Sequence, residues 1–224
     1  MAGQVLTLAG PGGCGKTRLA IRVCRTAAEA WRDGVFWVGL EEETDGSDVA
    51  HRMAAALDVL LPAGPDPVPA LVSALRDREL LVVVDNCEHV LDDAARVVAA
   101  VLSKCPRVAV LATSRSRLGI AGERVWRVPP MDLADALELF LERVRAGAPD
   151  AAGGSGGAVG AEARSGARRI CDRLDRLPLA LELAAGWAGA LSLAQIADSL
   201  SAPFALLDGG ARTAPFGSGR CRGR

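Results

Sequence analysis

The segment 10–17, Gly-Pro-Gly-Gly-Cys-Gly-Lys-Thr, constrains the fold most, because it matches the pattern G-x-x-x-x-G-K-[ST] in full. An apolar run over 5–9 predicts a buried strand before it, and helical spacing predicts a helix over 15–32 after it. Glycines in such a loop let backbone N–H groups curl around a phosphate, which the helix N-terminus also attracts. We expect Lys16 to reach the β- and γ-phosphates of ATP or ADP and Thr17 to bind Mg²⁺. The predicted nucleotide-binding residues here are Gly10, Pro11, Gly12, Gly13, Cys14, Gly15, Lys16, Thr17 and Arg18.

Lysine usage supports this interpretation. The chain has 26 basic residues, and all are arginine except Lys16 and Lys104. The planar guanidinium of arginine does not replace a compact ammonium inside a closed phosphate loop. A lysine at position 16 in an arginine-rich chain therefore favours a phosphate site.

A second element follows the apolar run 80–85, which predicts a central parallel strand ending in Asp85. An acid at the carboxyl end of such a strand can hold Mg²⁺ beside a nucleotide. The next residue, Asn86, is not an acid, so Glu88 is the nearest carboxylate that could polarise an attacking water. A solvated loop position for Glu88 is an open alternative.

A third element is the predicted strand 108–113, which is followed by Ser114 and Arg115. Thr113 or Arg115 could reach the γ-phosphate from the carboxyl end of this strand. Asp85, Glu88 and Arg115 are therefore the candidate catalytic residues, and Thr17 and Asp85 are the candidate Mg²⁺ ligands.

Strands and helices alternate up to residue 130, which predicts an α/β domain with a parallel sheet flanked by helices over 1–130. The pattern then becomes helical, so we predict a small all-helical subdomain over 131–211. Seven glycines over 147–166 predict a flexible excursion within it. The Gly- and Arg-rich end, 212–224, is expected to be a disordered basic tail.

Composition excludes several classes of protein. Acidic and basic residues number 27 and 26, which gives no general affinity for nucleic acids or anionic membranes, so we expect no direct DNA binding by this chain. The six cysteines form no C-x-x-C or Cys/His cluster, which favours reduced thiols in the cytoplasm. The longest apolar stretch, 177–191, is too short to span a membrane, and no signal peptide is recognisable.

Four segments in order, 10–17, 81–89, 112–115 and 177–185, resemble the NB-ARC-type P-loop ATPase of the STAND class. The similarity covers roughly residues 4 to 212 and is closest to the modules of large bacterial LuxR-type and SARP-type transcriptional regulators. It implies a switch that rests with ADP and opens after exchange for ATP. It also implies that Asp85 is the Walker B acid, that Arg115 senses the γ-phosphate, and that Pro178 faces the nucleotide. Arg176 stands where the family has glycine.

Two departures from the family lead to an expectation about the chain itself. No Gly-Arg-Glu segment precedes the first strand, and no winged-helix subdomain follows residue 212. We therefore expect a truncated product or a piece of a longer protein, in which self-association or effector domains would complete the switch. Such a module is expected to hydrolyse ATP slowly or not at all. A stand-alone P-loop ATPase or kinase with a small substrate and a remnant that binds no nucleotide are the open alternatives.

Overall fold

The computed structural model describes residues 4–40, 49–62, 64–148, 160–200 and 219–221. Among these residues the chain splits into two compact units. The sheet unit comprises 4–12, 16–128 and 219–221, and the helical unit comprises 13–15 and 129–200. Each unit has its own hydrophobic core and is described by itself.

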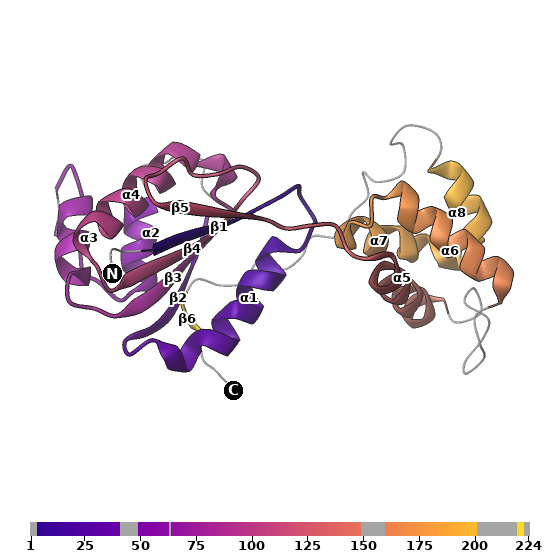
Figure 1. Cartoon of the computed structure of the whole chain (residues 1–224), viewed down its shortest axis with the longest axis horizontal. Helices are drawn as coiled ribbons and strands as arrows, with labels where there is room; N and C mark the ends of the chain where they lie inside the picture. Colours follow the sequence, from indigo (N-terminus) through magenta and orange to yellow (C-terminus); the bar gives the residue numbers. More distant parts are fainter. Residues whose placement is uncertain (1–3, 41–48, 63, 149–159, 201–218, 222–224) are drawn as a thin grey trace. The chain divides into compact units, whose positions relative to one another are not determined.

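The sheet unit is built on a sheet with the strand order β5-β1-β4-β3-β2-β6 (Figure 1). Five strands are parallel, and the short sixth strand runs antiparallel to β2. This arrangement confirms the predicted α/β class. The strands are β1 (Gln4–Ala9), β2 (Gly34–Gly39), β3 (Leu80–Asp85), β4 (Val108–Ser114), β5 (Glu123–Arg127) and β6 (Gly219–Cys221).

Helices cover both faces of this sheet (Figure 1). On one face, α1 (Lys16–Ala27) packs Ala20 and Cys24 against Leu8, Trp37 and Val83. On the other face, α2 (Val49–Ala56), α3 (Val68–Leu75) and α4 (Leu91–Lys104) bury the alternate strand residues. The short 3-10 helix η1 (Ala28–Ala30) follows α1, so the α-helix ends before the predicted residue 32.

The parallel register brings the ends of the central strands to one edge. Ala9 of β1 pairs with Ser114 of β4, and Asp85 of β3 pairs with Gly39 of β2. All six residues of β3 are buried, as expected for a central strand rich in valine and leucine. Polar residues that follow these strands therefore gather at the same edge.

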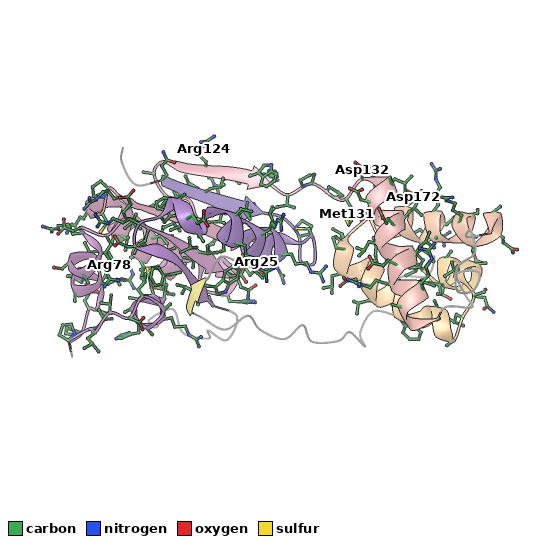
Figure 2. All side chains as sticks on the ribbon, turned by 90° about the horizontal axis from the view of Figure 1, so that it is seen from below. Arg25, Arg78, Arg124, Met131, Asp132 and Asp172 are labelled. Atoms are coloured by element: carbon green, nitrogen blue, oxygen red, sulfur yellow. The ribbon has the colours of Figure 1, made fainter. Side chains whose placement is uncertain are left out.

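The helical unit contains α5 (Leu133–Gly147), α6 (Ala161–Arg173), α7 (Pro178–Ala185) and α8 (Leu193–Ser199), with the 3-10 helix η5 (Gly186–Gly189). Its core includes the fully buried Phe140, Ile170 and Leu181. Asp132 precedes α5, and Asp172 lies on the exposed side of α6 (Figure 2). Ser192 begins the last helix with a capping box in which its side chain and that of Gln195 each accept a backbone N–H.

The predicted flexible excursion over 147–166 is too long at both ends. Gly147 is the last residue of α5, and 161–166 form the start of α6, where alanine, glutamate and arginine favour a helix. Gly166 packs closely there, since a Cβ added to it would lie 3.0 Å from Cβ of Leu193. Residues 149–159 lie outside the described residues.

The C-terminal segment differs from the expected disordered tail in the residues that the structure describes. Residues 219–221 form β6 along the outer edge of β2, whose backbone N–H and C=O groups provide pairing partners. The other residues of 212–224 lie outside the described part of the chain. Within the described residues, no helix is both long enough and apolar enough to cross a membrane.

A candidate nucleotide-binding site

The loop between β1 and α1 holds a buried lysine. Lys16 is 8% exposed, and its Nζ donates hydrogen bonds to the carbonyl oxygens of Gly10 and Pro11, each at 2.9 Å. Gly13 and Gly15 have φ of +76° and +96°, a conformation that side chains disfavour. The lysine is thus held over its own loop, directly at the start of a helix, which fits a phosphate-binding role.

Thr17 links this loop to the end of the central strand. Its Oγ1 lies 3.0 Å from Oδ1 and 3.2 Å from Oδ2 of Asp85, so the hydroxyl donates to the carboxylate. A hydroxyl and a carboxylate in contact are oxygen ligands of the kind that Mg²⁺ prefers. The two predicted Mg²⁺ ligands, far apart in sequence, are therefore brought together.

Asp85 is a buried carboxyl group, with 3% of the residue exposed. Burial raises the pKa of Asp85, and hydrogen bonds from Thr113 and Thr17 oppose this shift. The nearby Glu88 raises the pKa further, whereas Lys16 lowers it. A bound cation would favour the ionised form of such a group.

Thr113 has a different place from the one predicted. Its Oγ1 donates to Oδ1 of Asp85 at 2.5 Å and accepts the backbone N–H of Asn86 at 3.0 Å. The residue is 1% exposed, so its hydroxyl holds the strand end rather than reaching toward solvent. Asn86 has a left-handed φ of 67°, which asparagine tolerates and which turns the chain into the 3-10 helix η3 (Cys87–His89).

The sequence alone did not predict this support of Asp85 by Thr113. The available signal was the position of a threonine at the carboxyl end of the strand next to β3. Parallel neighbours place such ends side by side, but spacing does not say which hydroxyl donates to which carboxylate.

The third group of predicted residues forms an ion pair. Nε of Arg115 donates to Oε1 of Glu88 at 3.2 Å. The other oxygen, Oε2, is buried and accepts no hydrogen bond from the described residues. Arg115 is thus bound to Glu88 at the same edge of the sheet as Asp85.

The remaining predicted residues lie at separate places. Cys14 is a buried free thiol within the loop, and Arg18 is exposed on α1. Pro178 is the first residue of α7 in the helical unit. Arg176 has a φ of 53°, so the position where the family has glycine keeps a conformation that suits glycine.

Comparisons with known proteins identify the family. The model of the NB-ARC domain matches residues 2–144. The chain belongs to the NB-ARC family. This finding confirms the resemblance to NB-ARC/STAND modules of bacterial regulators.

Relatives with similar sequences include regulators much longer than this chain. A Mycobacterium tuberculosis protein named as an HTH-type transcriptional regulator is 41% identical over 214 residues, covering 94% of this chain and 23% of the relative. An uncharacterized protein of the same organism is 38% identical and is covered over 52% of its length. Regulatory protein AfsR of Streptomyces griseus is 32% identical, with 87% of this chain and 20% of AfsR covered. This NB-ARC chain thus spans about a fifth to a quarter of the length of these regulators.

Solved structures support the fold. A STAND protein with a tetratricopeptide repeat sensor from Pyrococcus horikoshii has a TM-score of 0.52 at 18% identity, covering 81% of this chain and 27% of that chain. Cdc6p from Pyrobaculum aerophilum has a TM-score of 0.54 at 19% identity, covering 83% and 55%. Both likenesses show a P-loop NTPase fold for this NB-ARC chain.

Proposed function

We propose that this chain is the nucleotide-binding switch module of a longer regulator and binds ATP or ADP with Mg²⁺. One observation carries the proposal: the loop lysine, the first helical hydroxyl and the strand-end carboxylate are joined within one site. Lys16 contacts its own loop, and Thr17 contacts Asp85. Such a connection serves no evident packing need, since it keeps an ammonium and a carboxyl group mostly out of water.

Each residue has a distinct task in this proposal. Lys16 neutralises phosphate charge, while Thr17 and Asp85 would hold Mg²⁺, which supplies further neutralisation of the phosphates. Thr113 keeps the Asp85 carboxyl group oriented through its hydrogen bond. Arg115 would sense the γ-phosphate, and Pro178 would face the nucleotide, as the family resemblance implies.

We also propose that hydrolysis is slow or absent. Asn86 follows Asp85 directly, and an amide cannot accept a proton from an attacking water. Glu88, the candidate for that role, is paired with Arg115. A module that retains its nucleotide suits a switch better than a fast enzyme, and self-association would be the response in the longer protein.

The location proposed for the module is the cytoplasm. Five of the six cysteines, Cys14, Cys24, Cys87, Cys105 and Cys171, are free buried thiols, which is typical of a reducing compartment.

The test uses the two lysines of the chain. The full chain, its Lys16→Ala variant and its Lys104→Ala variant are titrated with ADP and with a non-hydrolysable ATP analogue, with and without Mg²⁺, by calorimetry. We expect Lys16→Ala to weaken binding by roughly 10- to 100-fold, because it removes the charge at the phosphates. Lys104 is exposed at the end of α4, so Lys104→Ala should bind as the unmodified chain does. Equal affinities for all three proteins, or no binding by any, would refute the proposal.

A further inference from the structure

Glu88 and Arg115 differ sharply in exposure although they form one ion pair. The side chain of Glu88 is 12% exposed, whereas that of Arg115 is 64% exposed. Glu88 belongs to η3, directly after β3, and Arg115 follows the end of β4. The carboxylate is therefore fixed by the protein, and the guanidinium extends from it toward solvent.

The guanidinium has a defined direction. Glu88 contacts it at Nε, the atom nearest the side-chain stem. Its far end lies beside the phosphate loop, because a Cβ added to Gly12 would be 3.9 Å from Nη2 of Arg115. A guanidinium is planar, so both Nη atoms lie in one plane with the Nε that Glu88 contacts.

The same geometry argues against Glu88 as the group that polarises water. One of its oxygens accepts from Arg115, and the other is buried without a described partner. One oxygen is thus engaged by the guanidinium, and the other is kept from solvent. The pair instead joins a fixed anion to a cation that points at the loop.

From this arrangement we infer that Glu88 is a positioning residue, which holds Arg115 so that its Nη atoms face the phosphate loop. The inference rests on the function proposed above. Its consequence is specific: the preference of the site for ATP over ADP depends on Glu88, and Glu88 acts only through Arg115. Removing the carboxylate releases the guanidinium and breaks no hydrogen bond of the loop, of Lys16 or of Asp85, although it removes one of the charges that raise the pKa of Asp85.

A double-mutant cycle tests this dependence. Affinities for ADP and for a non-hydrolysable ATP analogue, each with Mg²⁺, are measured for the full chain and for Glu88→Ala, Arg115→Ala and the double variant. We expect Glu88→Ala to lower the ATP-over-ADP preference about 3- to 10-fold and Arg115→Ala to lower it at least as much. The double variant should match Arg115→Ala, since Glu88 has nothing left to position. Glu29, an exposed glutamate of η1, provides the matched control Glu29→Ala, which should leave the preference unchanged.

Two results would overturn the inference. One is a Glu88→Ala variant that keeps the full preference while Arg115→Ala loses it. The other is an additive double variant, which would mean that Glu88 acts on the nucleotide by a route of its own.

A second measurement needs no nucleotide and separates this inference from the proposed function. In ¹⁵N NMR spectra of the full chain, the Arg115 Nε–H signal is assigned by its loss in Arg115→Ala. We expect this signal to shift in Glu88→Ala and to shift less in Glu88→Gln, because the amide keeps an acceptor oxygen without the charge. An Arg115 signal that does not move in Glu88→Ala would show that the pair is absent. If the signal moves but no nucleotide binds, the pair stands and the proposed function fails.

Discussion

The two units bury different kinds of side chain. Among the described residues of the sheet unit, five polar or charged residues are buried: Thr7, Lys16, Asp85, Thr113 and Ser114. In the described part of the helical unit, the buried side chains are hydrophobic, with Phe140 and Ile170 fully covered. Both units have an apolar core, so burial drives the folding of each. Within the residues that the structure describes, only the sheet unit also buries the charged side chains of a lysine and an aspartate, which costs stability unless they are hydrogen-bonded or serve a function.

This contrast separates folding from chemistry within one chain. Lys16, Asp85 and Thr113 are all satisfied by hydrogen bonds, yet each is placed at the edge where three strands end. The helical unit needs no such arrangement to close its core. Substitutions of buried residues in the two units should therefore change the free energy of unfolding by amounts that differ in sign as well as in size.

The largest expected effect is in the helical unit. Phe140→Ala should lower the free energy of unfolding of that unit by about 3–5 kcal/mol, because it leaves a cavity where a fully buried ring was packed. Urea denaturation of the full chain, followed by circular dichroism, measures this loss. Glu138→Ala on the exposed side of α5 is the control and should change stability by less than about 0.5 kcal/mol. A loss below about 1 kcal/mol for Phe140→Ala would contradict the conclusion that apolar burial drives the folding of the helical unit.

The second prediction has the opposite sign. Asp85→Asn should raise the free energy of unfolding of the nucleotide-free protein at pH 7 by about 1 kcal/mol, because a buried carboxylate no longer has to be ionised. The same substitution should abolish the stabilisation that Mg²⁺ with ADP gives, since it removes a candidate metal ligand. Thermal unfolding with and without both ligands measures both effects.

The pH dependence checks the physical cause of this gain. Burial raises the pKa of Asp85 in the folded state, so the folded protein holds this proton more tightly than the unfolded chain does. The contribution of Asp85 to stability is therefore present at low pH and is lost as pH rises from the ordinary aspartate range through the raised pKa. Asp85→Asn should become more stable than the unmodified chain over that interval, whereas Asp92→Asn, at an exposed position of α4, should not. An Asp85→Asn variant that is less stable at neutral pH would show that the ionised carboxyl group stabilises the fold.

The sequence predicted most of the sheet unit for a physical reason. Strands β1, β3 and β4 are short apolar runs that end in aspartate or serine or are followed directly by glycine, so their positions and ends can be predicted without a structure. The loop motif placed Lys16 and Thr17, and the parallel topology then placed Asp85 beside them. Boundaries were less accurate where composition misleads, as at 161–166, which are helical in spite of the glycine-rich surroundings.

The contacts within the site were harder to predict than its members. Thr113 and Arg115 were both candidates for the γ-phosphate, but Thr113 donates to Asp85, and Arg115 donates to Glu88. Each partner is more than twenty residues away in sequence and is chosen by side-chain direction, which periodicity does not encode. The left-handed conformation of Asn86, which directs Glu88, was likewise not apparent from the strand pattern.

The smallest expected effect returns to the helical unit and concerns the start of its last helix, α8. Ser192 precedes α8, and its side chain accepts the backbone N–H of Gln195 at 3.3 Å, while Oε1 of Gln195 accepts the N–H of Ser192 at 2.9 Å. Ser192→Ala should lower the free energy of unfolding by about 0.5–1 kcal/mol, because the first turn of a short helix loses its cap.

Ser199→Ala offers a matched control for this cap. Its hydroxyl donates to the carbonyl oxygen of Gln195 within the same helix, a group that is already part of the helical backbone, so little stability should be lost. Urea denaturation of both variants measures the two losses in the free energy of unfolding. Equal losses in the free energy of unfolding would mean that any serine hydroxyl on α8 stabilises the unit as much as the cap does. The stability of the helical unit would then depend on more than its buried apolar side chains and its capped helix ends.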